Sequence, residues 1–499
     1  MKIKLNKLKK SLKNIALLEG MENLLHWDLE TNLPKGAIEN RAEQAELIST
    51  LVHKAYTQKK LKNQLHEFIE FKSGKIIAKN LNKVENRLLE VTYKDWRKKN
   101  SLPASFVKNF ARSTTKAQFA WEQARKENDF TIFSPYLAKL IKLAKKKADY
   151  FNWQTTRYDA LLDEFEPETT TKMLNPIFDN LKIEIKNLLK KLQETKKFSA
   201  PFPNLKFNEQ QQEIFAKKLL KAMNFDFDCG RLDISTHPFT SNFHTTDVRL
   251  TTKYLADNLM MALSSTMHEG GHGLYEQNMN PDFAYTPLLQ APSFGIHESQ
   301  SRLWEILVGL SFDFWQGFYP DLQKIFPAEL GQIELADFYQ YINQVKPSLI
   351  RIEADELTYN LHIIIRFELE QMMINDKIEV QDLPDLWNQK YQDYLGVKPK
   401  KLSEGILQDV HWSCGYFGYF PSYTLGNLYS AQIFATAKKE IPNLKASLAE
   451  KSLIPLFAWL KTKVYQQARL YSAKELIHLI TDEELTPDYF TAHLKEKYL

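Results

Sequence analysis

Apolar residues recur at helical spacing along most of the chain. Leu5, Leu8 and Leu12 follow one another at intervals of three and four residues, and the segment from Leu181 to Leu192 has the same spacing. A period of this kind puts one apolar stripe on each helix. Alternating runs rich in valine, isoleucine and threonine, which mark strands, are scarce. The pattern therefore predicts an all-α, mainly helical protein.

One stretch is compatible with β structure, residues 233–252, which are rich in serine, threonine and aromatic side chains. It predicts a small β-hairpin just before a helix over residues 254–267. No linker rich in proline, glycine or serine divides the chain, so we expect one large domain over residues 1–499. Within it, helices up to about residue 100 are expected to form an N-terminal lobe over the rest. The catalytic core is expected at residues 230–430.

The composition is that of an ordinary globular protein, with 43% hydrophobic and 25% charged residues. A net charge of +5 over 499 residues does not indicate nucleic-acid binding. No apolar run approaches the roughly 18 residues of a membrane span, and no signal peptide is evident. Cys229 and Cys414 lie far apart in the sequence, which favours a reducing compartment. We therefore expect a cytoplasmic protein.

The candidate chemistry centres on the segment from His268 to His272, which reads His-Glu-Gly-Gly-His. Two histidines four residues apart on a helix share one face and can bind one Zn²⁺ ion. Glu269 lies on the neighbouring face, where it can act as general base toward a water molecule. Each glycine costs a helix about 1 kcal/mol relative to alanine. The glycines here therefore indicate that substrate or another helix approaches closely.

A catalytic zinc site needs a third protein ligand. One known extension of the motif places a histidine six residues after the second ligand, but that position is Asn278. We expect Glu298, near the start of a following helix, to be the third ligand, with Arg302 one turn later to orient it. Glu276 and Glu305 remain alternative third ligands. His297 is expected to be a structural or substrate-side residue.

Further segments resemble the metallocarboxypeptidases of the thermostable carboxypeptidase Taq type. They occur in the family's order across nearly the whole chain, and together they are far more specific than the zinc motif alone. The matching segments are Trp27-Asp28 with Thr31, His237-Pro238-Phe239, residues 247–251, residues 268–272, residues 297–301, residues 350–355 and residues 405–412.

The resemblance implies a helical fold with a long central groove, a zinc or cobalt ion on the groove floor, and a homodimer. It also implies release of single amino acids, with broad specificity, from peptides with a free C-terminus. The sequence therefore predicts a zinc-dependent metallocarboxypeptidase without a nucleic-acid or membrane partner. One alternative is a related helical zinc oligopeptidase or dipeptidase. Another is a metal-stabilised peptide-binding scaffold without turnover, against which the intact Glu269 argues.

A carboxypeptidase must recognise a free α-carboxylate, and arginine does so through its bidentate fork. Arg249 and Arg351 lie in matching segments and are the candidates, with His237 as a further candidate substrate-binding residue. Each arginine has a structural alternative. Arg249 could form an ion pair with Asp247, and Arg351, expected inside a helix, could form one with Asp355.

The oxyanion that forms when water attacks a peptide carbonyl needs a hydrogen-bond donor. His411 and Tyr423 are the candidates, and Tyr419 is an alternative to Tyr423. The two tyrosines lie in a segment, residues 415–426, that is rich in glycine and aromatic residues and is expected to be a loop lining a pocket.

Overall fold

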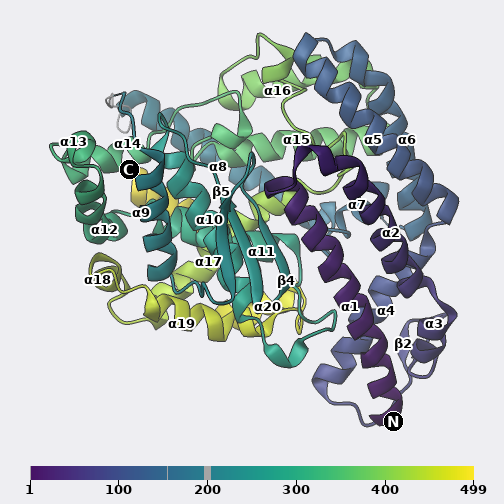
Figure 1. Ribbon diagram of the computed structural model, residues 1–499. Coiled ribbons are helices and arrows are strands. Elements are labelled where there is room, and N and C mark those ends of the chain that lie inside the picture. Colours follow the sequence, from purple (N-terminus) through teal and green to yellow (C-terminus); the bar gives the residue numbers. More distant parts are fainter. Residues whose placement is uncertain (1, 154, 196–203) are drawn as a thin grey trace.

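The computed structural model describes residues 2–153, 155–195 and 204–499, and these residues are mainly helical (Figure 1). The expected fold class is confirmed. The helices of the first half are α1 (Lys2–Thr31), α2 (Ile38–Thr57), α3 (Lys59–His66), α4 (Lys83–Ser101), α5 (Ala104–Glu127), α6 (Phe130–Phe151), α7 (Arg157–Leu162), α8 (Thr171–Thr195) and α9 (Glu209–Ala222). Those of the second half are α10 (Leu259–Asn278), α11 (Phe294–Arg302), α12 (Phe312–Ile325), α13 (Pro327–Leu330), α14 (Leu335–Ile342), α15 (Tyr359–Ile374), α16 (Leu383–Leu395), α17 (Pro421–Glu440), α18 (Leu444–Ala449), α19 (Ile454–Lys463), α20 (Ala473–Thr481) and α21 (Asp488–Tyr498).

A three-stranded sheet lies directly before the motif helix. Its strands are β3 (Gly230–Ile234), β4 (Thr240–His244) and β5 (Asp247–Thr252), in the order β3-β5-β4. β4 and β5 form an antiparallel hairpin, whereas β3 is parallel to β5. The expected hairpin before the motif helix is thus present as β4 and β5, and the sheet has a third strand, β3, that the sequence did not predict. The segment after β3 bonds to Thr251 through the Ser235 hydroxyl and the Phe239 N–H, which takes the chain across to the far side of β5.

A second, smaller pair of strands, β1 (Ile69–Glu70) and β2 (Lys75–Ile76), pairs antiparallel in the first hundred residues. Helix α1 runs the length of this N-terminal region, shown in purple in Figure 1, and packs along the edge of β4. The Asn23 side-chain amide donates to the Asn242 carbonyl at 3.1 Å. Helix α1 therefore forms one wall beside β4, an outer strand of the sheet that precedes the motif helix.

Most buried apolar side chains of the described residues belong to one continuous core, whose largest members include Trp304, Trp315 and Trp387. Burial of this extent stabilises the fold by the hydrophobic effect. Among the described residues, no helix combines the length and apolarity that crossing a bilayer requires. The middle of the molecule, where β4, β5, α10, α11 and α17 lie together (Figure 1), contains the candidate site.

Candidate metal centre and substrate site

The motif histidines lie on α10, which begins at Leu259 rather than at residue 254 as the sequence suggested. Asn258 caps the helix by accepting the Met261 N–H at 3.0 Å, and such a side-chain acceptor fixes where a helix starts. The glycines of α10 allow other elements to approach. A Cβ on Gly271 would lie 2.5 Å from the Gln300 carbonyl oxygen of α11, and one on Gly273 would lie 2.8 Å from the Leu250 side chain of β5. Close packing of α11 and β5, rather than substrate, explains these two glycines.

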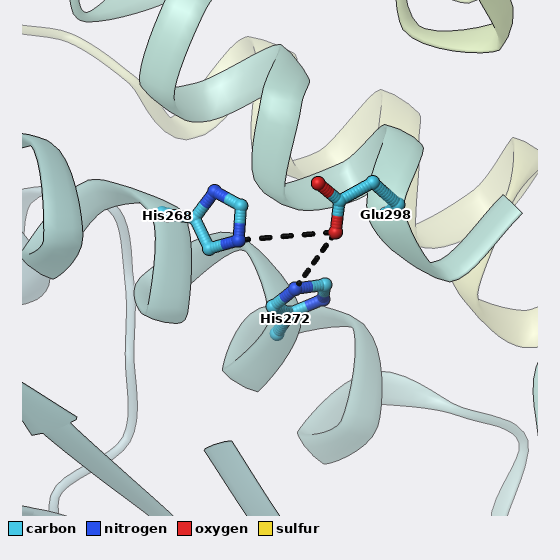
Figure 2. A group of neighbouring side chains, drawn as sticks. All are labelled: His268, His272 and Glu298. Atoms are coloured by element: carbon cyan, nitrogen blue, oxygen red, sulfur yellow. Dashed lines mark ion pairs between the residues drawn. The ribbon is translucent and has the colours of Figure 1, made fainter. Parts of the chain in front are cut away.

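Three ligand atoms converge between α10 and α11 (Figure 2). The Nε2 atoms of His268 and His272 lie 3.8 and 3.5 Å from Oε2 of Glu298, and all three atoms lie within 4.8 Å of one another. Ligands about 2.1 Å from a tetrahedral zinc ion are separated by about 3.4 Å. The donor set and its spacing therefore fit a divalent cation such as Zn²⁺.

Glu305 lies behind this group instead of in it. Its carboxylate accepts from Nδ1 of His268 at 2.8 Å, from Nη1 of Arg302 at 2.8 Å and from the Ser264 hydroxyl at 3.0 Å. It belongs to a π-helical turn, Leu303–Val308, that continues α11. A carboxylate on the far nitrogen of a ligating histidine fixes its tautomer and ring orientation. The sequence suggested that Arg302 bonds to the Glu298 carboxylate. In the structure Arg302 bonds to Glu305 and to Asn427 instead.

The other alternative ligand, Glu276, pairs with His297. Nε2 of His297 lies 2.7 Å from Oε1 of Glu276, and the other carboxylate oxygen, Oε2, accepts from the Asn242 side-chain amide. The His297 ring stacks on the His272 ring, with centroids 4.4 Å apart. Among the described residues, Nδ1 of His272 has no hydrogen-bond partner. The two motif histidines are therefore held differently, one by a carboxylate and the other by a neighbouring ring.

The electrostatics of the centre favour a cation. Burial lowers the pKa of His268, but the Glu298 and Glu305 carboxylates outweigh it and raise that pKa to about 9. Burial, together with His297, lowers the pKa of His272 to about 3, so its imidazole is neutral and can ligate a metal. Burial raises the pKa of Glu298, but His268, His272 and Arg302 outweigh it and lower it to about 2. The centre thus holds an ionised carboxylate with positive charge drawn toward it.

Glu269 is 6% exposed and points from α10 toward β4. The Thr240 hydroxyl donates to its Oε2 at 2.6 Å. Burial raises the pKa of Glu269, while His268 and the Thr240 bond lower it in part. A carboxylate with a raised pKa is a better proton acceptor near neutral pH than an ordinary surface glutamate.

His411 and Tyr423 are brought together, with Nε2 of His411 3.2 Å from the Tyr423 hydroxyl. Burial and the Arg351 charge lower the pKa of His411 to about 3, so its ring is neutral. Tyr423 lies in the first turn of α17, so the expected loop over residues 415–426 is only half correct. Pro421 at the first position of α17 starts the helix there. Tyr419 lies beside Tyr423, with ring centroids 5.3 Å apart.

Arg351 is 7% exposed and lies in a short 3₁₀ turn, Arg351–Glu353, not in the expected helix. Its guanidinium pairs with Asp409, with Nε and Nη2 each 2.9 Å from Oδ1, and Nη1 donates to the Tyr359 hydroxyl at 3.1 Å. The structural partner expected from sequence, Asp355, instead accepts the Thr358 hydroxyl and the Thr358 and Lys346 N–H groups. The ion pair with Asp355 was therefore a wrong expectation.

Arg366 of α15 completes this cluster, and sequence reasoning missed it. Its Nε donates to Oδ2 of Asp409 at 2.6 Å, so two guanidiniums share one buried carboxylate. An arginine inside the apolar run from Ile363 to Phe367 is the signal that could have revealed it, because charged side chains are almost never fully buried without a partner.

Arg249 and His237 lie apart from that cluster. Arg249 makes a two-point ion pair with Asp247, at 2.8 and 3.0 Å, and lies over the Trp27 ring at 4.5 Å. The ion pair with Asp247, which was the structural alternative to a substrate role for Arg249, is therefore present. His237 is exposed in the bend between β3 and β4, and its carbonyl accepts the Ser235 hydroxyl. The described contacts connect neither side chain to the metal centre.

A groove lies beside His297, the residue whose ring stacks on His272. Two adjoining cavities, of about 570 and 450 Å³, share Glu19, Tyr56 and Glu276 in their linings. The first also contacts His297, and the second follows α1 along the Asn242–His244 edge of β4. A volume of this size accommodates several residues of an extended peptide.

A family model described as carboxypeptidase Taq (M32) metallopeptidase matches residues 7–498 of the chain. Carboxypeptidase 1 of Bacillus subtilis is 39% identical over 98% of this chain and 96% of its own length. Thermostable carboxypeptidase 1 of Pyrococcus furiosus is 39% identical over 96% of this chain and 95% of its own. The crystal structure of the M32 carboxypeptidase from Deinococcus radiodurans R1 superposes with a TM-score of 0.95, at 36% identity and 99% coverage of both chains.

Proposed function

The chain belongs to the carboxypeptidase Taq (M32) family and is a metallocarboxypeptidase, and from this premise we propose that it releases single C-terminal amino acids of broad type from peptides. The observation that carries the finer proposal is the proximity of two sites. A His–His–Glu centre lies on α10 and α11, and a buried arginine pair is linked through Tyr359 to Arg302 of α11. The first suits peptide hydrolysis and the second suits a free carboxylate.

We propose Zn²⁺ as the metal, with Co²⁺ as a possible substitute, held by His268, His272 and Glu298. Two imidazoles and one carboxylate are a donor set that catalytic zinc sites use. When bound, such an ion supplies Lewis-acid polarisation and a more acidic water molecule. Glu305 fixes the ring of His268 for this task through the bond to Nδ1.

We propose Glu269 as the general base. Its burial and the Thr240 bond hold the carboxylate in one orientation, and its raised pKa suits proton transfer near neutral pH. Glu269 takes the proton from the attacking water as the oxygen bonds to the scissile carbonyl carbon. It then gives that proton to the leaving amine nitrogen as the peptide C–N bond breaks.

We propose Arg351 as the principal ligand of the substrate carboxylate. Arg351 and Arg366 together carry two positive charges against the single negative charge of Asp409, and His411 beside them is neutral. A buried site with one uncompensated positive charge favours an anion. Tyr359 lies between this cluster and α11. Its hydroxyl accepts from Arg351, and the Arg302 guanidinium of α11 lies over its ring, 4.9 Å from the ring centroid.

Arg249 and His237 remain proposed substrate-binding residues on the basis of their family motifs. Arg249 lies over the Phe243 ring at 5.0 Å, and Phe243 lines the second cavity. For the oxyanion we propose His411 and Tyr423, whose ring nitrogen and hydroxyl are adjacent and whose neutral forms can donate.

The proposal also covers the assembly and the location of the protein. The family resemblance supports a homodimer, which sedimentation measurements can test. Both cysteines are free, which supports a cytoplasmic location. We also propose one domain over residues 1–499. In it, helices up to about residue 100 form a lobe over a catalytic core at residues 230–430, because α1 packs along β4 and lines the groove.

Mass spectra of peptide digests test this function. We expect successive losses of single C-terminal residues, and an amidated peptide of the same sequence should be cleaved poorly. Internal fragments or dipeptide products would instead establish the alternative, a related zinc oligopeptidase or dipeptidase. Glu269→Gln should reduce kcat by ~10²–10⁴-fold with the metal retained, and an unchanged kcat would remove Glu269 from the role of base.

A further inference from the structure

The segment between His411 and Tyr423 contains little regular structure before α17 begins, yet it carries both proposed oxyanion donors. Between these two residues the chain makes several turns, in which Gly415 and Gly418 have φ values of +75° and +89°. Irregular backbone of this kind needs partners outside itself to hold one conformation. Two buried carboxylates that the catalytic proposal does not use supply those partners.

The first carboxylate is Glu370 of α15, which is completely buried. Its Oε1 accepts the Trp412 indole N–H at 2.8 Å, and its Oε2 accepts the Gly418 N–H at 2.9 Å and the Tyr158 hydroxyl at 2.8 Å. Tyr158 belongs to α7. Three donors therefore converge on one carboxylate and join the middle of the segment to α15 and α7.

The second carboxylate is Glu166, which follows α7 and is also completely buried. Its Oε1 accepts the Ser422 hydroxyl at 2.6 Å and the Gly295 N–H at 2.5 Å. The preceding residue, Phe165, accepts the Phe294 N–H at 3.0 Å. The chain after α7 thus satisfies the first N–H groups of α11, the helix of Glu298, and binds the first turn of α17, the helix of Tyr423.

Neither carboxylate is paired with a cation in the described structure, and both accept only neutral donors. Burial raises the pKa of Glu166 and that of Glu370 to about 7. A buried carboxylate of this kind is retained at a cost, since the charged form is poorly solvated there. Packing alone would be served better by an apolar side chain of the same size.

We propose that Glu166 and Glu370 are positioning residues that clamp residues 411–423 against α7, α11 and α15, and so hold His411 and Tyr423 beside the metal centre. The proposal rests on the proposed function, because it assigns the clamped side chains their role in the reaction. Glutamine cannot replace Glu370 fully, whereas both bonds of Glu166 go to Oε1, so only an apolar side chain removes that clamp. At Glu370 the amide nitrogen would face either the Trp412 or the Gly418 N–H, both of which are donors.

The first experiment compares Glu166→Met and Glu370→Gln with the wild type in steady-state kinetics and in hydrogen–deuterium exchange. We expect kcat to fall by ~10–100-fold, as misplacement of about 1 Å does, with KM and zinc affinity changed little. Exchange across residues 411–423 should increase at least severalfold, while exchange in α10 should remain as it is. The matched control is Asp321→Asn, another buried carboxylate, which pairs with Lys218 and Lys451. It should leave kcat and exchange at 411–423 unaltered.

Two milder variants keep the test decisive if either of these variants does not fold. Tyr158→Phe removes one donor to Glu370, and Ser422→Ala removes the bond between Glu166 and α17. Each should lower kcat by ~2–10-fold, the value of one hydrogen bond. Unchanged kcat and unchanged exchange at 411–423 in all folded variants would overturn the clamp. A wild type that released no single C-terminal residues would overturn the proposed function instead, and the exchange data would still decide the clamp.

Discussion

At the metal centre two carboxylates face one guanidinium, that of Arg302, which bonds to Glu305 and acts on Glu298 through its charge alone. At the arginine cluster the arrangement is reversed, because two guanidiniums, those of Arg351 and Arg366, share the single carboxylate of Asp409. With both imidazoles neutral, as metal ligation requires, each region therefore has one uncompensated charge, negative in the first and positive in the second. In the metal-free centre the proton that Glu298 and Glu305 hold on His268, whose pKa they raise to about 9, offsets the negative charge. Each excess charge therefore favours a ligand of opposite sign, a metal cation at the first site and a peptide carboxylate at the second.

The largest expected effect comes from removing the negative excess at the metal centre. Glu298→Ala leaves the two motif histidines without the carboxylate that lies between them, while Arg302 keeps its bond to Glu305. We expect the variant to lose bound metal at micromolar zinc and its peptidase activity to fall to background, because catalytic zinc needs three protein ligands. Metal analysis after gel filtration, alongside peptide digestion, measures both. Retained stoichiometric zinc would contradict the assignment of Glu298.

The positive excess can be removed with Arg351→Met, which keeps much of the side-chain volume. Loss of a charge-assisted bond costs about 1.5–3 kcal/mol, so kcat/KM for a free peptide should fall by ~10–150-fold. The same peptide with an amidated C-terminus should lose little further activity in this variant. Arg249→Met, a second arginine already paired with an aspartate, is the matched comparison, and an equal loss there would mean that the two arginines share the role.

A smaller change tests Glu305, the carboxylate that lies behind the three ligands. Glu305→Gln keeps the hydrogen bond to Nδ1 of His268 possible but removes one of the two negative charges. We expect zinc affinity to fall ~10–100-fold while saturating zinc restores most of kcat. Competition with a coloured chelator measures the affinity. Unaltered affinity would show that Glu298 alone accounts for the negative excess.

The smallest effect concerns Glu370, one turn after Arg366 on α15. Burial raises its pKa from 4.5 to about 7, while Gly418, Trp412, Tyr158 and the charge of Arg366 lower it only in part. The folded chain therefore binds this proton more tightly than the unfolded chain. The resulting stability is complete below about pH 4.5 and is lost as the pH rises toward 7.

We expect the difference in unfolding free energy between wild type and Glu370→Gln to change by up to about 3 kcal/mol between pH 4.5 and pH 8. Urea denaturation at a series of pH values measures it. A constant difference would mean that Arg366 neutralises Glu370 and that the cluster has no positive charge left for substrate.

The sequence predicted the local parts of the site well. Helical spacing alone places His268 and His272 on one face, and a second helix after Ser293 brings Glu298 to them. The start of α10 was misplaced by five residues, although Asn258 before an apolar run is a capping signal. Local chemistry determines these features, so a single sequence contains them.

Long-range pairing could not be predicted in this way. Asp409 lies 58 residues after Arg351 in the chain, and only the packing of α15 against residues 405–412 brings it to both arginines. Asp355, the nearer acid, is occupied by backbone N–H groups. Similarly, sequence spacing places Glu305 near His268 and makes it an alternative ligand. It does not show that the Glu305 carboxylate contacts Nδ1 of His268, the ring nitrogen that faces away from the metal site.

Gly271 and Gly426 limit how the centre can be altered. Gly271 lets the backbone of α10 contact that of α11, and Gly426 of α17 lies directly against the Glu298 side chain, so a Cβ at either position would collide. The separation of the ligands is thus set by the main chain and not by adjustable side-chain packing. Redesign for an ion of larger radius would have to move whole helices. The selectivity of the centre for ion size therefore depends on Gly271 and Gly426, because these glycines set the distance between the helices.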